Sequence, residues 1–562
     1  MKKCCLIFTI FYVVYSFNVS AQYPDWKWAK SFGSTVHDKG YSIHVDNSSN
    51  IYTSGVFFGA IDLDPGPGVF NVGSRGAFIS KLSDVGDFIW GGAFNGTCGI
   101  YKIAPGLNNK IIAAGSFANV VDFDPGPGVN NDTAIGIENF FICQFDSSGD
   151  MDWLKVFGGI NYQIVADLIV STTGDGSIYA TGLFYDTIDF KFSTGLMGVK
   201  SSGVEDIFII KLDSQGELIW AKTVGGYGDD RAFRMAMDSE GSHIYLTGYY
   251  SDTADFDPGP DTSILVTQGL TARFIAKYDS AGNYIWAKQF GDRDTLYPSV
   301  NTIAVDPVSG DIFITATNSG TNDFDPGPGT YNISSLAFTE RIVCRLDSAG
   351  NLIWAKQVAT PAGNADVLIF DGIQPGSFYL GGTFNNWRDF DPGPGEFKMN
   401  SPYGRCFLAS FDGLGNFGGA IQWGASVFDI IYDMRIDAYG RPHVIGDFWN
   451  LNVTFGQTTL VNTTSGQTDV YVAQLDSNFI TRTLEPSVNS VSTMLVFPNP
   501  ALHSIRLDPY PDGQVRIFNS QGQLMRVFEL KPGDTAELDI DNLNPGIYCL
   551  QAGSQIRKFI KN

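Results

Sequence analysis

Asp122-Phe123-Asp124-Pro125-Gly126-Pro127-Gly128 is a stretch that recurs along the chain and decides its fold. Further copies occupy 62–68, 323–329 and 389–395, and a near copy at 255–261 ends in Asp instead of Gly. A degenerate version, Asp189-Phe190-Lys191-Phe192, lies between 128 and 255. The first Asp residues of successive copies are therefore 60, 67, 66, 68 and 66 residues apart. A period of this kind predicts a repeat architecture.

Each period contains four short strand-like pieces. In one copy these pieces are 233–237, 244–250, 274–278 and 284–288, and the turn Asp279-Ser280-Ala281-Gly282-Asn283 joins the last two. The same turn begins at Asp146, Asp213 and Asp347, with a Gly available for positive φ. Short β-rich segments divided by regular turns predict an all-β array, and four strands per unit is the blade of a β-propeller.

Counting the pieces predicts seven blades. Third strands are expected at 78–82, 141–145, 208–212, 274–278, 342–346, 407–411 and 470–475, whereas fourth strands with a Trp are expected only at 90, 153, 220, 286, 354 and 423. The missing fourth strand is Trp28-Ala29-Lys30, near the N-terminus, which matches Trp220-Ala221-Lys222. We therefore expect an all-β fold, a seven-bladed β-propeller closed by an N-terminal strand, followed by a small C-terminal β-sandwich. Six or eight blades remain alternatives because 417–450 is degenerate.

Charge and hydropathy predict where in or outside the cell the protein is located. The chain of 562 residues has a net charge of −23; the first 21 residues contribute +2 and the last 70 are neutral, so the middle carries −25. Such a surface repels phosphate backbones, which argues against nucleic-acid partners. Residues 1–21 read as a signal peptide, with Lys2 and Lys3 before a short apolar run and Val19-Ser20-Ala21 as the cleavage site. We expect no transmembrane segment in the mature chain.

The segments Lys211-Leu212-Asp213-Ser214-Gln215-Gly216 and Ile219-Trp220-Ala221-Lys222, with Ile244-Tyr245-Leu246-Thr247-Gly248, carry a family resemblance. They resemble the bacterial β-propeller repeat family of secreted proteins, and we assign 22–480 to this propeller. The resemblance implies a fold but little about activity, because propellers host many functions.

The last 70 residues form a different domain, 493–562, behind a linker at 481–492. It begins near Val496-Phe497-Pro498-Asn499-Pro500, continues to Gly546-Ile547-Tyr548 and ends in the basic Arg557-Lys558-Phe559-Ile560-Lys561. This order resembles the type A C-terminal sorting domain of the type IX secretion system. The resemblance implies that the secretion machinery is a partner and that the protein is secreted or held on the outer cell surface, commonly with removal of the tail.

The repeated acidic loops allow two interpretations. Alternating carboxylates in a Gly-rich loop could supply oxygen ligands to calcium. Alternatively, each Pro fixes φ, each Gly permits positive φ, and the Asp side chains cap backbone amides in a rigid turn. We favour the turn and keep calcium as the one candidate cofactor. The candidate ligands are Asp62, Asp64, Asp122, Asp124, Asp255, Asp257, Asp323, Asp325, Asp389 and Asp391.

Binding is expected on the face that carries these loops and the connections between blades. Asp229 and Asp230 lie in one connection, and Asp292 and Asp294 lie in the next. The Trp residues in the repeated fourth-strand position are expected to pack, whereas Trp387 lies outside that position and is the candidate for stacking against a ligand.

No nucleophile elbow, metal-ligand His pair or phosphate loop is evident in the sequence, so we name no catalytic residue. We interpret the protein as an exported binding or adhesion module for a glycan or a surface protein. The rival interpretation is an extracellular polysaccharide-degrading enzyme that uses carboxylates on the long-looped face. A purely structural surface-layer component is a third alternative.

Overall fold

In a computed structural model the chain divides into two compact parts, Met1–Thr483 and Leu484–Asn562. The described residues are 26–171, 174–192, 195–267, 269–290, 300–335, 340–358, 367–372, 374–424, 429–449, 451–462, 464, 466–476, 495–497, 503–508, 513–519, 524–530, 537–552 and 555–561. The expected signal peptide at 1–21 and the linker at 481–492 lie outside them.

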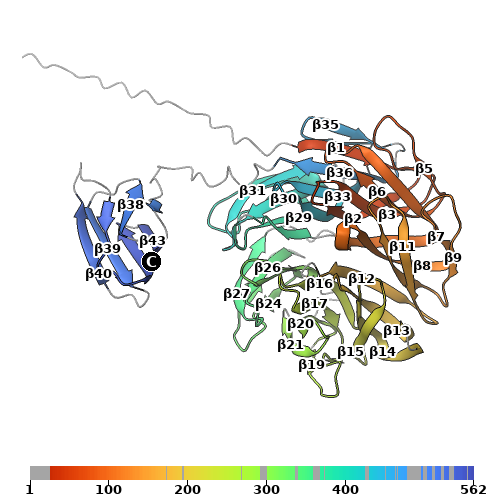
Figure 1. The fold of residues 1–562 in the computed structure, drawn as a ribbon, viewed down its shortest axis with the longest axis horizontal. Coiled ribbons are helices and arrows are strands. Elements are labelled where there is room, and N and C mark those ends of the chain that lie inside the picture. The colour runs from red at the N-terminus through yellow and green to blue at the C-terminus, as the bar shows by residue number, and fades with distance from the viewer. Residues whose placement is uncertain are drawn as a thin grey trace, which may run out of the picture. The chain divides into compact units, whose positions relative to one another are not determined.

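The first part is built from four-stranded antiparallel units, each running from an innermost to an outermost strand, and some units belong to longer sheets of eight or six strands (Figure 1). One sheet contains β16 (Arg231–Met237), β17 (His243–Tyr250), β20 (Ala272–Asp279) and β21 (Tyr284–Phe290). Two others repeat this order: β22 (Val300–Val305), β23 (Ile312–Asn318), β26 (Glu340–Leu346) and β27 (Leu352–Val358), then β28 (Val367–Phe370), β29 (Phe378–Asp389), β30 (Lys398–Phe411) and β31 (Phe417–Trp423). This is the arrangement of a β-propeller-like repeat fold.

Long strands join some of these units. A single strand, β7 (Phe88–Pro105), is outermost in one four-stranded unit and innermost in the next, and it links β2 (Asp38–Val45), β3 (Ile51–Phe57) and β6 (Gly76–Leu82) to β8 (Ile111–Asp122), β10 (Asn139–Phe145) and β11 (Met151–Phe157). The next unit consists of β12 (Gln163–Val170), β13 (Ile178–Phe192), β14 (Gly195–Leu212) and β15 (Leu218–Gly226). Each expected third strand falls within an observed strand.

The N-terminal strand belongs to the last sheet of the repeat region. β1 (Trp26–Phe32) pairs antiparallel with β36 (Asp469–Leu475), and Trp28 lies opposite Gln474. The sheet continues through β33 (Pro442–Phe448) to β32 (Ile430–Ile436). Strands from the two ends of the repeat region thus form one sheet.

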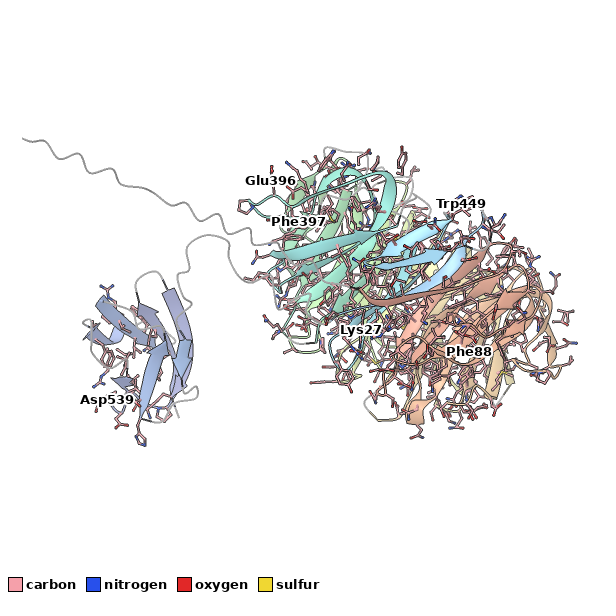
Figure 2. The ribbon with its side chains drawn as sticks, turned by 90° about the horizontal axis from the view of Figure 1, so that it is seen from above. Lys27, Phe88, Glu396, Phe397, Trp449 and Asp539 are labelled. Carbon is pink, nitrogen blue, oxygen red and sulfur yellow. The ribbon has the colours of Figure 1, made fainter. Side chains whose placement is uncertain are left out.

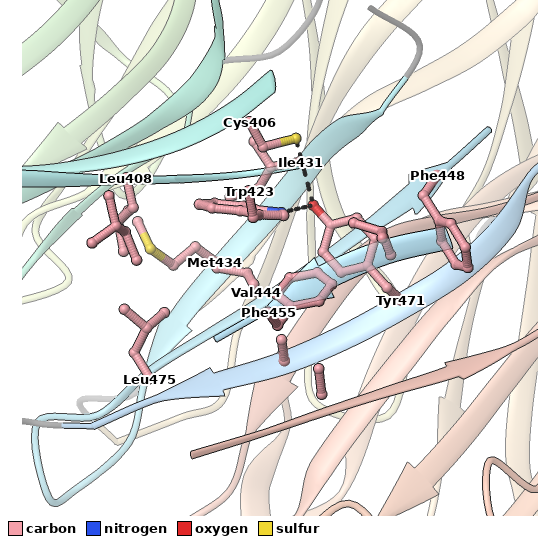
Figure 3. Packing of buried hydrophobic residues seen from close by; sticks show 14 of the residues in the cluster. Cys406, Leu408, Trp423, Ile431, Met434, Val444, Phe448, Phe455, Tyr471 and Leu475 are labelled. Atoms are coloured by element: carbon pink, nitrogen blue, oxygen red, sulfur yellow. Dashed lines mark hydrogen bonds between the residues drawn. The ribbon is translucent and has the colours of Figure 1, made fainter. Parts of the chain in front are cut away.

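Trp423 does not occupy the expected fourth-strand position. In five other units, the fourth-strand Trp pairs with the penultimate residue of the expected third strand; these Trp residues are at 90, 153, 220, 286 and 354. In this unit the penultimate third-strand residue is Ser410, and it pairs with Gly419 instead of a Trp. Trp423 lies four residues further on, and its indole Nε1 donates to the Tyr471 hydroxyl at 3.3 Å (Figure 3). It is 2% exposed and fills the core of the last two sheets with Cys406 and Phe455. Trp423 therefore lies on the expected fourth strand, β31, but not at the position that the other Trp residues share.

The second part contains two small sheets. One joins β37 (Leu495–Phe497), β38 (Ser504–Asp508) and β41 (Glu537–Asp539). The other joins β40 (Leu524–Leu530), β39 (Gly513–Asn519), β42 (Gly546–Ala552) and β43 (Gln555–Lys561). Ile505 and Leu538 from the first sheet share one buried cluster with Val515, Ile517 and Leu550 from the second.

Candidate functional site

The acidic loops have one repeated geometry. The first Asp accepts the backbone N–H of the residue two places on at 3.0–3.1 Å, and that of the residue eight places on at 2.7–2.8 Å. The second Asp accepts the N–H of the following Gly at 2.7–2.8 Å. These bonds hold in all five copies, whose first and second Asp are Asp62 and Asp64, Asp122 and Asp124, Asp255 and Asp257, Asp323 and Asp325, and Asp389 and Asp391. One oxygen of each carboxylate is thus occupied by the turn itself.

The glycines of these loops act differently from our expectation. None of them has a positive φ; the backbone at Gly126 and Gly128 lies in ordinary regions. A Cβ on Gly128 would overlap Oδ2 of Asp124. At Gly68, Gly329 and Gly395, a Cβ would likewise overlap Oδ2 of the second Asp of the same loop. Glycine at these four positions lets the carboxylate lie against the backbone, whereas the fifth copy carries Asp261 there and keeps the same hydrogen bonds. Where the loop is degenerate, the hairpin ladder of β13 and β14 continues to the pair Phe192 and Gly195.

Within the described ranges, no group of three or more His, Cys, Asp or Glu side chains is arranged to hold a metal ion. Each acidic loop brings only its own two carboxylates together. Calcium at these loops therefore remains an expectation.

Asp230 is engaged by backbone groups. It is fully buried, and its carboxylate accepts the N–H of Gly226 at 2.6 Å and that of Ser251 at 3.2 Å. Burial raises the pKa of Asp230 to about 7, against the lowering effect of these two hydrogen bonds. Its neighbour Asp229 accepts the Ser251 hydroxyl at its carbonyl oxygen. Asp292 and Asp294 lie outside the described residues.

Asp38 occupies the same place in another sheet as Asp230 does in its own, and it has the same kind of backbone hydrogen bonds. Asp38 also stands at the start of an innermost strand, and it accepts the N–H groups of Ser34 and Phe58. Burial raises its pKa to about 7 as well. The same arrangement in two sheets favours a role in fixing the connections between blades.

Trp387 lies on an open groove at the edge of the first part. Its side chain is 63% exposed, and it stands on β29 opposite Asn400 of β30. The groove has a volume of about 650 Å³ and is also lined by Trp26, Phe397 and Met399. Figure 2 shows Phe397 and Glu396 at the periphery, where the β29–β30 hairpin ends. The sequence indicated Trp387 as a ligand-stacking residue. It did not indicate Trp26, which lines the same groove only because β1 pairs with β36 in the last sheet.

Polar groups complete this groove. Asn400 and Lys398 are exposed along one wall, and Lys398 forms an ion pair with Glu396 at 2.9 Å. On the floor, the buried Oε1 of Gln422 accepts no hydrogen bond from the described protein. An aromatic platform with amide groups beside it suits a flat, hydroxyl-rich ligand.

The innermost strands line a second cavity at the centre of the first part, with a volume of about 340 Å³. Each of six innermost strands carries a β-bulge, and the extra residues are Tyr41, Tyr101, Ala166, Phe233, Asn301 and Tyr432. Bulges of this kind re-aim side chains. Three of the six are tyrosines, from the neighbouring strands β32, β2 and β7, and all three line the cavity. Sequence reasoning missed this group; its only signal was one extra residue in the alternation of each strand.

Comparison with known proteins assigns the tail. Residues 495–562 match the family described as the secretion system C-terminal sorting domain. An uncharacterized WD repeat-containing protein of Acanthamoeba polyphaga mimivirus is 26% identical over 217 residues, which cover 34% of this chain and 15% of the viral protein. The chain thus spans less than a fifth of that relative's length.

Two solved structures resemble the chain distantly. PorZ, a bacterial surface component of the type IX secretion system of Porphyromonas gingivalis, is 10% identical with a TM-score of 0.19, over 95% of this chain and 100% of that one. The WD40 domain of Pan2 from Neurospora crassa is 10% identical with a TM-score of 0.27, over 67% of this chain and 89% of that one. The strand pairing of the chain itself, rather than these likenesses, carries the fold.

No helix among the described residues is long and apolar enough to cross a membrane. A sorting domain is recognised by the secretion machinery, and a protein that carries it is secreted or reaches the outer cell surface. The chain is therefore a propeller-like repeat protein that ends, at 495–562, in a C-terminal sorting domain of the type IX secretion system.

Proposed function

We propose that the protein binds glycans at the outer cell surface or after release, through the groove that contains Trp387. The observation that carries this proposal is the 63% exposure of a Trp side chain on a groove of about 650 Å³. Exposing a large indole is unfavourable in water, and a sugar ring that covers it recovers this cost through apolar and CH–π contact. Gln422, Asn400 and Lys398 supply hydrogen-bonding groups for sugar hydroxyls.

The charge of the protein narrows the class of glycan. A net charge of −23 disfavours a strongly anionic polymer on the outer surface. A neutral oligosaccharide is therefore the expected ligand of this groove. Attachment to a neutral glycan would give the adhesive role, whereas a purely structural surface-layer component would bind no sugar.

A glycan array followed by calorimetry tests the proposal on the full chain. Soluble probes are cellohexaose, mannohexaose and chitohexaose. For the glycan that binds, Trp387→Ala is expected to weaken affinity by about tenfold or more, as aromatic contacts at hot spots do. Tyr227→Ala is the matched control, because Tyr227 is also an exposed aromatic residue, at 80%, but lies outside the groove. Binding that is absent, or unchanged in Trp387→Ala, would contradict the proposal.

The rival enzymatic function is tested in the same samples. Reducing ends that appear with turnover, and disappear when a single Asp is changed, would establish hydrolysis. The arrangement at Asp229 and Asp230 favours the binding role, because Asp230 is buried and engaged by backbone N–H groups. A glycosidase needs two carboxyl groups that reach the same sugar linkage.

We infer further that the repeat region is a seven-bladed propeller closed by β1. Supporting this, the innermost strand β2 contacts β7 and β32, β12 contacts β7 and β16, and β22 contacts β16 and β28, which in turn contacts β32. Pairing of β1 with β36 supplies the last sheet with its outermost strand. The proposed organisation is a signal peptide at 1–21, the propeller at 22–480, a linker at 481–492 and the sorting domain at 493–562.

A further inference from the structure

The central cavity differs in charge from the rest of the molecule. Its described lining holds three cationic side chains, Lys102, Arg234 and Arg435, and two carboxylates, Asp167 and Asp433. The lining therefore carries one excess positive charge inside a protein of net charge −23. In a partly enclosed site of low dielectric, such a charge acts strongly on a ligand.

Both carboxylates are engaged within the protein. Asp433 accepts the Ser42 hydroxyl at 2.8 Å and the N–H of Ile43 on the neighbouring strand at 3.3 Å, and it pairs with Arg435 at 2.7 Å. Burial by itself raises the pKa of Asp433, but the charges of Arg435 and Lys102 with these hydrogen bonds hold it below its ordinary value. Asp433 is thus ionised and satisfied.

Asp167 repeats this pattern between two other strands. It accepts the N–H of Leu168 at 2.9 Å and that of Met235 on β16 at 2.8 Å. Lys102 lies between the two carboxylates, 3.9 Å from Asp167 and 3.5 Å from Asp433. One lysine is therefore shared by both acids.

Arg234 has no such partner. The only hydrogen bond of its guanidinium within the described part of the chain goes to the carbonyl oxygen of Phe233, the preceding residue, at 2.9 Å. No carboxylate among the described residues forms an ion pair with it. A guanidinium has five N–H donors, and a carboxylate accepts two of them in a fork.

The wall two to three innermost strands away from Arg234 is aromatic. The Tyr41 ring lies 5.5 Å from the Tyr101 ring and 5.1 Å from the Tyr432 ring, both edge to face. Tyr41 and Tyr432 both lie near the carboxyl group of Asp447, and Tyr101 lies near Glu138. The three tyrosines thus give the cavity an aromatic wall.

We propose that the central cavity binds a carboxylate-bearing sugar of monosaccharide size, such as a hexuronic acid. Arg234 receives the carboxylate, and the tyrosine wall covers the sugar ring. A volume of about 340 Å³ fits one such ring and falls at the lower end of the range for ligand sites, about 300–1,000 Å³. This site is separate from the Trp387 groove: the central cavity takes an anionic ligand, whereas the groove takes a neutral one.

Calorimetry of the full chain with sodium D-glucuronate, D-glucuronamide and D-glucose tests the proposal. Glucuronate is expected to bind about tenfold or more tightly than glucuronamide, which keeps the ring but lacks the charge, because a charge-assisted hydrogen bond is lost. Sodium acetate, which lacks the ring, is expected to bind more weakly than glucuronate. Equal binding of glucuronate and glucuronamide, or no binding of either, would overturn the proposal.

Variants locate the site. Arg234→Gln is expected to remove the preference for glucuronate over glucuronamide, and Arg234→Lys to retain part of it. Lys200→Gln is the matched control, because it removes the same charge at a side chain that is 78% exposed on β14. If Arg234→Gln unfolds, two other measurements test the site: the preference for glucuronate in the Arg234→Lys variant, and the comparison of ligands on the unaltered chain. A preference for glucuronate that persists in Arg234→Gln, or that disappears in Lys200→Gln, contradicts the assignment.

The two sites are distinguished by cross-testing. Trp387→Ala is expected to leave glucuronate binding unchanged, and Arg234→Gln to leave the binding of a neutral oligosaccharide unchanged. Loss of glucuronate binding in Trp387→Ala would show that the acid binds in the groove and would overturn the central site alone.

Discussion

The indole of Trp90 packs against the backbone of Gly149, in the turn of the following four-stranded unit. A Cβ on Gly149 would lie 2.8 Å from the indole carbons, and the indole Nε1 donates to the Ser147 carbonyl oxygen of the same turn at 3.0 Å. The same contact with the following unit recurs at Trp28 with Gly86, Trp153 with Gly216, Trp220 with Gly282, Trp286 with Gly350 and Trp354 with Gly415. The repeated Trp thus holds neighbouring four-stranded units together.

This contact predicts that Gly149 tolerates no side chain. Its φ of 96° is unfavourable for other residues, and an added methyl group would meet the indole. Gly149→Ala is expected to lower the free energy of unfolding by about 1–3 kcal/mol. Trp90→Ala is expected to cost about 3 kcal/mol, the lower end of the range for core Trp, because the ring is only half-buried.

Urea denaturation measures both changes, with Trp387→Ala as the control. Trp387 touches solvent over most of its surface, so its removal is expected to change stability by less than about 0.5 kcal/mol. A Trp90→Ala variant as stable as the Trp387→Ala variant would contradict the role of the contact between sheets.

The acidic loops predict a uniform cost for losing their first carboxylate. In Asp122→Ala, the N–H groups of Asp124 and Asn130 lose their acceptor, so the variant is expected to be less stable by about 1–2 kcal/mol. Asp389→Ala should behave alike, because its bonds are the same. Asp261→Ala is the control, since Asp261 is exposed in its loop. Denaturant unfolding that shows Asp122→Ala to be as stable as Asp261→Ala would contradict this account.

Calcium at the same loops is tested by chelation. If the loops are turns held by their own hydrogen bonds, the addition of EDTA is expected to leave the melting temperature unchanged. If they bind calcium, EDTA lowers it and added calcium restores it, because a ligand that binds only the folded state stabilises that state. Thermal melts with and without EDTA, with metal content measured by mass spectrometry, separate the two interpretations.

Asp447 predicts a loss of stability with rising pH. It is 1% exposed, and burial raises its pKa to about 8 against the opposing charge of Lys39. The folded chain therefore holds a proton that the unfolded chain releases near its ordinary value of about 4. The contribution of Asp447 to the free energy of unfolding falls as the pH rises from about 4 to about 8.

Asp447→Asn checks this sign. The amide does not ionise, so the variant is expected to gain stability over the unaltered chain as the pH approaches 8, and to match it near pH 4. Denaturant unfolding across this window measures the difference. A difference that is independent of pH, or that grows toward acid, would contradict the assignment.

Removal of the N-terminal strand tests closure. Deletion of 22–33 exposes the edge of β36 along Asp469–Leu475, and unpaired edge strands promote association between chains. The truncated chain is expected to melt at a lower temperature and to form oligomers in size-exclusion chromatography with light scattering. A monomeric variant of unchanged stability would show that β1 does not complete the last sheet.

Much of the fold could be predicted from local patterns. The Asp-Ser-x-Gly turns were recognisable because a left-handed residue is required, and Gly216 and Gly282 indeed have φ of 78° and 77°. The loop glycines were assigned a wrong cause, because the approach of Asp124 to Gly128 depends on how the loop closes. The position of Trp423 along its strand could not be predicted, because a shift of four residues in a β-strand leaves the side chain on the same face. The register is fixed only by the pairing of Gly419 with Ser410 and of Trp423 with Cys406 on the neighbouring strand.

The sequence alone determined the repeat, the four strands of each unit, the acidic outer surface and the sorting tail, because each depends on local residue order or on composition. The tertiary structure decided which side chains meet. Trp26 comes near Trp387, and Arg234 shares a cavity with Tyr41, only because strands far apart in the chain become neighbours. The physical reason is that each sheet is stabilised by contact with the next, so a site at their centre or between their edges has no counterpart in any single repeat.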